Sequence, residues 1–128
     1  MVEKIVLGKY RHYKNKEYNL EGIGVFSDLS VKILGFDSKR YYGTARYSEN
    51  PDYSVDVYKI GEGKFTLVSR QDQQGQEIPR VEYAVYRALY EGEFGRNVLW
   101  IRPLRGAEGF FMPKIIDGRE VLRFALIE

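Results

Sequence analysis

Residues 53–69 have the sequence YSVDVYKIGEGKFTLVS, and this stretch decides the fold class. Tyr53, Val55 and Val57 alternate with polar residues, which is the pattern of a strand with one buried face. Gly61-Glu62-Gly63-Lys64 then has the composition of a tight turn, and a second apolar run follows it. The stretch therefore predicts a β-hairpin.

Similar patterns extend this prediction along the chain. Asp117-Gly118 lies between two apolar runs and is the strongest short hairpin signal in the sequence. Gly22 and Gly24 predict a bend or bulge within their strand, and Pro103 ends its strand or places it at a sheet edge. Strands are expected at 10–13, 18–25, 29–36, 40–47, 53–60, 65–69, 99–104 and 121–127. Turns or loops are expected at 14–16, 48–52 and 71–76.

Val81–Leu89 fits two patterns. Apolar residues at 81, 84, 85, 88 and 89 form a helical stripe, whereas Tyr83, Val85 and Leu89 fit a strand. We favour a strand, because the segment is rich in Tyr and Val and no convincing N-cap precedes it. About eight short strands without a clear amphipathic helix predict an all-β fold, a small barrel or sandwich.

Composition limits the class of protein further. A chain of 128 residues is long enough for one domain and short for two, so residues 1–128 are expected to form a single domain. A net charge of +2 gives no general argument for nucleic acid. The lack of Cys excludes disulfides and thiolate chemistry. No signal peptide and no membrane span is expected, and a cytoplasmic location is the default.

Four motifs together resemble a bacterial family catalogued as domain of unknown function sixteen-fifty-three. The chain begins with Gly8-Lys9-Tyr10-Arg11-His12-Tyr13-Lys14 and later contains Val85-Tyr86-Arg87-Ala88-Leu89-Tyr90. Leu99-Trp100-Ile101-Arg102-Pro103-Leu104 and the hairpin Asp117–Phe124 follow. Gly43–Glu49 is also similar to a family segment, with Tyr47 where His is usual.

The resemblance implies a small SH3-like barrel. Family members place the first two motifs close together, whereas about fifty residues separate them here. We therefore expect a core barrel from residues 8–25 and 81–128, enlarged by an inserted β-hairpin region at about 26–80. The 10–13 and 99–104 strands should lie near each other. The family has no settled activity, so the resemblance implies no substrate and no cofactor.

Aromatic and basic residues gather in the first, second and third motifs. Tyr and Trp combine an apolar face with one polar atom, and Arg adds a planar fork of donors, so such clusters suit recognition. Trp100 is expected in the core, whereas Arg102 fits either a structural role or a groove shared with Tyr10 and Tyr13. Arg11 and Arg87 also fit cross-strand ion pairs. The candidate ligand-binding residues are Tyr10, Arg11, His12, Tyr13, Arg87, Trp100 and Arg102.

His12 is the single histidine of the chain. Histidine is the usual acid–base catalyst near neutral pH, yet no catalytic motif supplies a partner, and one His without Cys makes a poor metal site. Two classes of function therefore stay open. The first is a non-enzymatic binding module for a peptide, a nucleic acid or a small planar ligand. The alternative is a small enzyme that uses His12 as its acid–base residue.

Overall fold

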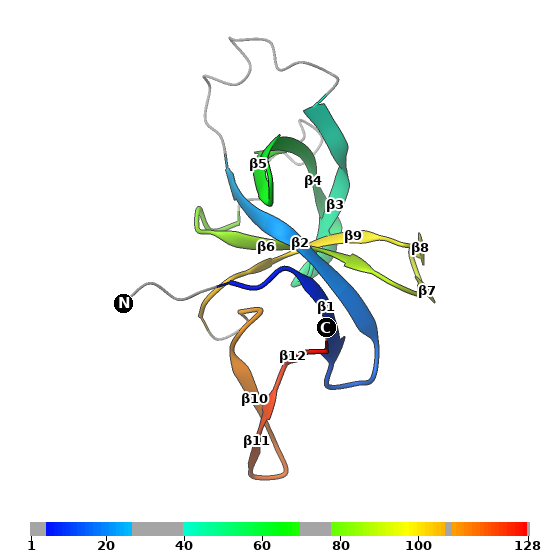
Figure 1. Cartoon of the computed structure of the whole chain (residues 1–128), viewed down its shortest axis with the longest axis vertical. Helices are drawn as coiled ribbons and strands as arrows, with labels where there is room; N and C mark the ends of the chain where they lie inside the picture. The colour runs from blue at the N-terminus through cyan, green and yellow to red at the C-terminus, as the bar shows by residue number, and fades with distance from the viewer. Residues whose placement is uncertain (1–4, 27–39, 70–77, 107–108, 128) are drawn as a thin grey trace.

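The computed structural model describes residues 5–26, 40–69, 78–106 and 109–127 (Figure 1). These residues form strands and turns without an α-helix, which confirms the all-β prediction. Accordingly, the described part of the chain contains no helix that could cross a membrane. The strands are β1 (Gly8–His12), β2 (Glu17–Phe26), β3 (Tyr41–Tyr47), β4 (Asn50–Gly61), β5 (Lys64–Ser69), β6 (Tyr83–Ala88), β7 (Glu91–Gly92), β8 (Gly95–Arg96), β9 (Leu99–Pro103), β10 (Pro113–Ile116), β11 (Arg119–Leu122) and β12 (Phe124–Leu126).

Six strands close into a barrel. Their order is β2–β5–β4–β3–β9–β6, and β6 pairs back onto β2. The pairs β2–β5 and β3–β9 are parallel, and the other four pairs of the barrel are antiparallel. β1 pairs with β2 outside this ring, and β12 pairs with β1. Closure satisfies the backbone groups that an open sheet would expose at its edges, and it confirms the predicted small barrel.

The region expected as an insertion is part of this barrel. β3, β4 and β5 all fall within residues 26–80, and they form three of the six strands of the barrel wall. The structure therefore differs from the expected division, in which residues 8–25 and 81–128 form the barrel and residues 26–80 extend it. The physical reason is pairing between distant segments: β5 lies beside β2, and β3 lies beside β9.

Two clusters of buried side chains stabilise the fold, and β6 separates them. Tyr83 and Val85 point to one side of β6, whereas Ala84 and Tyr86 point to the other. The first cluster contains Ala45, Tyr47, Tyr53, Val55, Val57, Phe65, Leu67, Tyr83, Val85, Leu99 and Ile101. The second contains Tyr10, Leu20, Ala84, Tyr86, Leu104, Phe110 and Phe124. Trp100, expected in the core, is partly buried and packs against the second cluster.

The 10–13 and 99–104 strands, which were expected to lie near each other, contribute to one cluster without pairing. β1 and β9 do not pair, because β2 and β6 lie between them. Their side chains nevertheless share the second cluster, which contains both Tyr10 and Leu104. The two segments thus lie on the same side of the molecule without forming neighbouring strands.

Several local predictions are confirmed. The 81–89 segment forms strand β6, and Gly61-Glu62-Gly63-Lys64 joins β4 to β5. Asp117 and Gly118 join β10 to β11 with φ values of 51° and 77°. Positive φ at both central residues is the geometry of a type I′ turn, which Asp-Gly favours.

Other local predictions are wrong or concern residues outside the described ranges. The expected 48–52 loop is only a turn at Ser48-Glu49, because β4 already begins at Asn50. The expected 121–127 strand is interrupted at Arg123, which separates β11 from β12. The β7–β8 hairpin was not predicted. The expected strand at 29–36 and the expected loop at 71–76 lie outside the described residues.

Two β-bulges direct side chains toward one site. In the β2–β6 pair, Leu20 is opposite Tyr86 and Gly22 is opposite Val85, so Glu21 is an extra residue. In the β3–β4 pair, the register skips Tyr42 in the same way. The predicted irregularity near Gly22 is thereby confirmed. A side chain there is excluded, since a Cβ on Gly22 would lie 2.5 Å from the Gly63 carbonyl oxygen. Bulges commonly re-aim side chains beside functional sites.

Candidate functional site

A pocket of about 350 Å³ opens between β3, β4, β6 and the segment that follows β8. We call it the arginine pocket. Its volume lies at the lower end of the range typical of small-molecule sites. It is lined by Gly43, Thr44, Arg46, Ser54, Arg87, Phe94, Asn97, Val98 and Leu99. Two of these nine residues are arginines, and none carries a carboxylate.

Arg46 and Phe94 form one wall of the arginine pocket. Arg46 comes from β3, and Phe94 comes from the turn of the β7–β8 hairpin, which projects beside β9 (Figure 1). The Arg46 guanidinium lies 4.1 Å from the centre of the Phe94 ring. One nitrogen, Nη1, donates to the Pro51 carbonyl oxygen at 2.8 Å. Contact with the face of the ring and this single bond hold the guanidinium in place.

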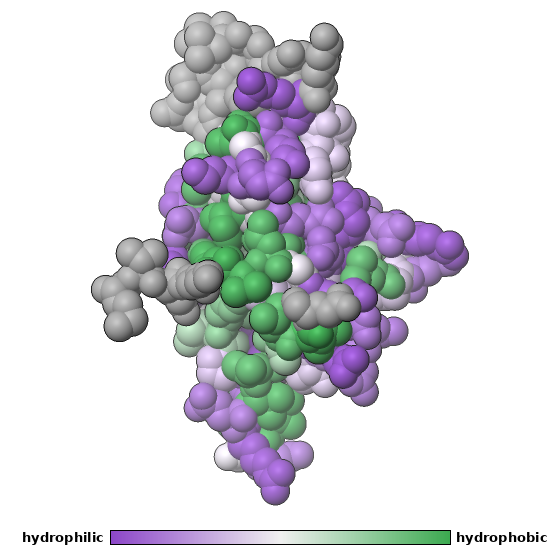
Figure 2. Space-filling view, viewed as in Figure 1, coloured by the Kyte–Doolittle hydropathy of each residue, from purple (hydrophilic) through white to green (hydrophobic). Residues whose placement is uncertain are grey.

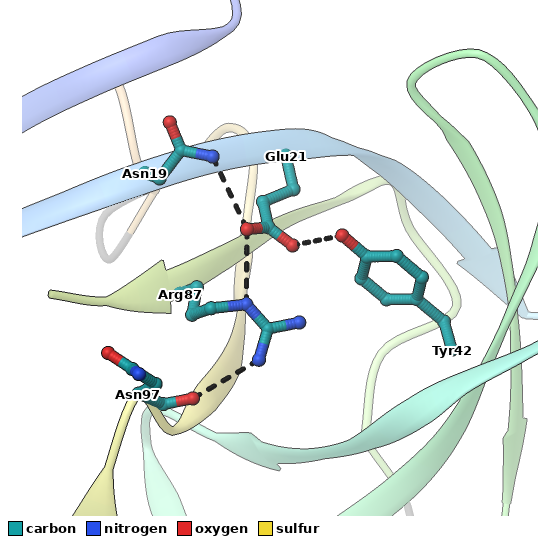
Figure 3. Close-up of polar contacts among 5 residues, drawn as sticks. All are labelled: Asn19, Glu21, Tyr42, Arg87 and Asn97. Atoms are coloured by element: carbon teal, nitrogen blue, oxygen red, sulfur yellow. Dashed lines mark hydrogen bonds and ion pairs between the residues drawn. The ribbon is translucent and has the colours of Figure 1, made fainter.

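Arg87 forms the opposite wall and is held by Glu21 (Figure 3). Its Nε donates to Glu21 Oε2 at 3.1 Å, and its Nη1 donates to the Asn97 carbonyl oxygen at 3.2 Å. Glu21 also accepts from the Asn19 amide and from the Tyr42 hydroxyl. The two bulged residues, Glu21 and Tyr42, thus bond to each other and position Arg87.

The protonation states of Arg87 and Tyr42 are fixed at neutral pH. Burial lowers the pKa of Arg87, but the hydrogen bond and negative charge of Glu21 outweigh it and raise that pKa above its usual value. Burial, followed by the bond to Glu21, raises the pKa of Tyr42. Arg87 therefore stays charged and Tyr42 stays neutral. Neither group is suited to proton transfer near pH 7.

His12 lies elsewhere, in an aromatic cluster beside β12. Its ring centre is 4.3 Å from that of Tyr13 and 4.9 Å from that of Phe124. Its Nδ1 accepts a bond from the Lys14 backbone N–H. Burial first, and then the charges of four basic residues, lower the pKa of His12 to about 4; these residues are Arg102, Lys14, Arg123 and Lys114. The side chain is therefore neutral at pH 7.

This environment predicts a specific pH dependence of stability. The unfolded chain binds a proton at His12 near the ordinary pKa of 6.5, whereas the folded chain binds it only near pH 4. The free energy of unfolding should therefore fall as the pH drops through this window, because the unfolded state binds more protons. A His12→Gln variant cannot take up this proton and should lose less stability between pH 7 and pH 5 in denaturant unfolding. An NMR titration that gives His12 a pKa of 6.5 or higher would contradict this account.

The structure separates the candidate residues that the sequence indicated. His12 and Arg102 lie near Phe124, the Tyr13 ring contacts that of His12, and Arg102 also donates to the Tyr86 hydroxyl. Arg87 lies in the arginine pocket instead. The remaining candidates have structural contacts: Tyr10 is only 4% exposed, Arg11 pairs with Glu17, and the Trp100 ring contacts Phe94 edge-on. Burial removes Tyr10 from the groove that we expected it to share with Tyr13 and Arg102.

Sequence reasoning missed Arg46, Phe94 and Asn97. Arg46 lies within Gly43–Glu49, the segment similar to the family, so its motif was a usable signal. Phe94 and Asn97 belong to or follow the short β7–β8 hairpin, where no strand was expected. Arg87 and Arg46 come from two separate motifs, and the barrel brings both to one pocket.

A second hollow, of about 410 Å³, is mainly apolar. Ile5, Leu7, Ile23, Val25 and Ile60 contribute to its lining, together with Glu62, Gly63, Lys64, Phe65 and Glu82. Figure 2 shows hydrophobic surface gathered near the middle of the molecule and continuing onto the β10–β11 hairpin, whose tip is hydrophilic. The hollow contains three charged side chains, Glu62, Lys64 and Glu82, but its lining is mainly apolar, whereas the arginine pocket contains two arginines held by neighbouring groups. We therefore take the arginine pocket as the candidate site.

Comparison with known proteins gave no match to a family model, a curated protein or a solved structure. The family resemblance therefore stays a prediction.

Proposed function

We propose that the protein is a non-enzymatic binding module and that the arginine pocket is its ligand site. One observation carries this proposal: two arginines fixed by aromatic rings and by Glu21 line a single pocket that has no carboxylate among its lining residues. The ligand classes that suit such a surface are a peptide, a nucleic acid or a small planar ligand. A cytoplasmic location is part of the proposal, since the chain has no cysteine and needs no oxidising compartment.

Preorganisation supports binding at this site. A free arginine side chain loses considerable rotamer entropy when it binds a ligand. Here the Arg46 guanidinium already lies on Phe94, and Arg87 is held by Glu21 and the Asn97 carbonyl oxygen. The side chain of Glu21 is only 12% exposed, so solvent weakens its ion pair with Arg87 less than it weakens a surface pair. Ligand binding at this site therefore costs less side-chain entropy than binding to two free arginine side chains would cost.

The alternative function, catalysis by His12, finds less support. All the charged groups that shift the pKa of His12 are cations, and they favour a neutral, weakly basic ring. A general base needs a pKa closer to the working pH, and it usually needs an orienting partner. His12 also lies away from the residues that line the arginine pocket.

Substitutions in the arginine pocket should separate binding from folding. Arg46→Ala removes a charged donor, and Phe94→Ala removes the ring beneath it, so each should weaken ligand binding by about tenfold or more. Arg96→Ala is the matched control. It removes one positive charge from β8, where Arg96 pairs with Glu91 outside the pocket lining. This control should bind nearly as well as the unmodified protein.

The ligand would be found with a panel of peptides, single-stranded oligonucleotides and nucleotides, followed by titration calorimetry. Each variant would also be melted, to confirm that it folds. A ligand that binds equally well to Arg46→Ala and Phe94→Ala would place the site elsewhere. Chemical conversion of a bound ligand by the protein would contradict a non-enzymatic role.

A further inference from the structure

The donors of Arg46 point to an anionic ligand. A guanidinium has five N–H donors, and Arg46 uses one nitrogen to bond the Pro51 carbonyl oxygen. Within the described residues, Arg46 has no carboxylate partner, whereas Arg87 is paired with Glu21. The pocket therefore offers one guanidinium that forms no ion pair with a carboxylate of the described residues. A fixed, planar fork of this kind matches a phosphate or carboxylate group with two parallel bonds.

The rest of the lining suits a flat ring with polar edges. Phe94, Val98 and Leu99 provide apolar surface, and the Arg46 guanidinium, which lies over the Phe94 ring, adds a planar group. Nucleobases stack on aromatic rings and on arginine planes. The side-chain amide of Asn97 makes no hydrogen bond to the described residues, although its backbone carbonyl accepts from Arg87. An amide offers both donors and an acceptor to the edge of a base.

We propose that the arginine pocket binds a single nucleotide unit, with the phosphate on Arg46 and the base against the Phe94–Asn97 wall. This inference rests on the proposed binding function and adds the chemistry of the ligand. The volume of about 350 Å³ suits one such unit rather than a longer segment. The unit is either a free nucleoside monophosphate or one nucleotide of a single strand, since both present the same phosphate and base.

The test is calorimetric titration of the full chain with defined probes. These are the four nucleoside 5′-monophosphates, the matching nucleosides, ribose 5-phosphate, inorganic phosphate and a single-stranded hexanucleotide. At least one monophosphate should bind about tenfold or more tightly than its nucleoside and than ribose 5-phosphate, because phosphate and base both contribute. A hexanucleotide that binds much more tightly, with an affinity that falls steeply with salt, would identify a strand as the source. Equal affinities for the hexanucleotide and the monophosphate would identify the free nucleotide as the ligand.

Variants connect this binding to the pocket. Arg46→Ala should remove most of the advantage of the monophosphate over its nucleoside, and Arg46→Lys should restore only part of it. Asn97→Ala should change the preference among the four bases while the protein stays folded. Arg96→Ala should leave all affinities nearly unchanged. A preference for phosphate that survives Arg46→Ala would overturn the inference.

The outcomes also distinguish the two proposals. Failure of every nucleotide, together with Arg46-dependent binding of a peptide or another planar acid, would overturn the nucleotide inference alone. Binding of nucleotides that is insensitive to Arg46→Ala and Phe94→Ala would overturn the proposed site as well.

Discussion

A chain in which residues 27–80 are replaced by a short Gly/Ser linker should fail to fold. The replacement removes β3, β4 and β5, so β2 loses its partner β5 and β9 loses its partner β3. It also removes seven of the eleven buried residues of the first cluster, which leaves Tyr83, Val85, Leu99 and Ile101 facing water. The free energy lost with this strand pairing and burial exceeds the stability of a small domain, which is roughly 5–15 kcal/mol. Circular dichroism and the dispersion of NMR signals would measure it.

Replacing the β10–β11 hairpin, residues 113–122, with a short turn is the matched control. This hairpin forms its own two-stranded sheet and projects from the barrel (Figure 1). The shortened chain should keep a cooperative thermal transition. A cooperative transition in the chain that lacks residues 27–80 would show that this region is peripheral, which would contradict the barrel described above.

Phe110→Ala should produce the largest loss of stability among single substitutions in the second cluster. Phe110 is fully buried, its ring stacks on Phe124 at 4.1 Å, and it meets Tyr10 and Tyr86 edge-on. Truncation of a buried Phe costs about 3–5 kcal/mol, because the transfer free energy is lost and a cavity remains. Denaturant unfolding at neutral pH would measure the change.

Phe111→Ala and Trp100→Ala are the comparisons for Phe110→Ala. Both side chains are only partly buried against the second cluster, so each should cost less than Phe110→Ala. Trp100→Phe should lower the stability less still, because it keeps an aromatic ring and removes a buried indole N–H that has no hydrogen-bond partner among the described residues. A Phe110→Ala cost below about 1 kcal/mol would show that the cluster refills the space, contrary to this packing.

Local patterns predicted the strands, but not their arrangement. Alternation identified β4, the Tyr and Val content of 81–89 decided for strand β6, and turn residues identified the hairpins at 61–64 and 117–118. The sequence did not show that residues 26–80 form part of the barrel wall. The parallel pairs β2–β5 and β3–β9 join segments that no single turn connects. Periodicity records which face of a strand is buried and says nothing about a distant partner. The expected extension is therefore part of the barrel wall.

The candidate site, too, could be predicted from the sequence only in part. Arg87 was predicted from its motif, whereas Arg46 and Phe94 meet only because the barrel places β3 and the β7–β8 hairpin together. Glycines in β2 indicated a bulge, yet the sequence did not show that the bulge would direct Glu21 to Arg87. The opening motif supplied His12 and Tyr13, which lie in a separate aromatic cluster.

The most direct test of the arginine pocket is an NMR titration of ¹⁵N-labelled protein with each of the four nucleoside 5′-monophosphates. The account predicts that at least one of them shifts the Arg46 side-chain Nε–H signal and the backbone amides of Phe94 and Asn97, while the amides of His12 and Tyr13 stay in place. Shifts centred on His12 and Tyr13, with the Arg46 signal unchanged, would contradict it.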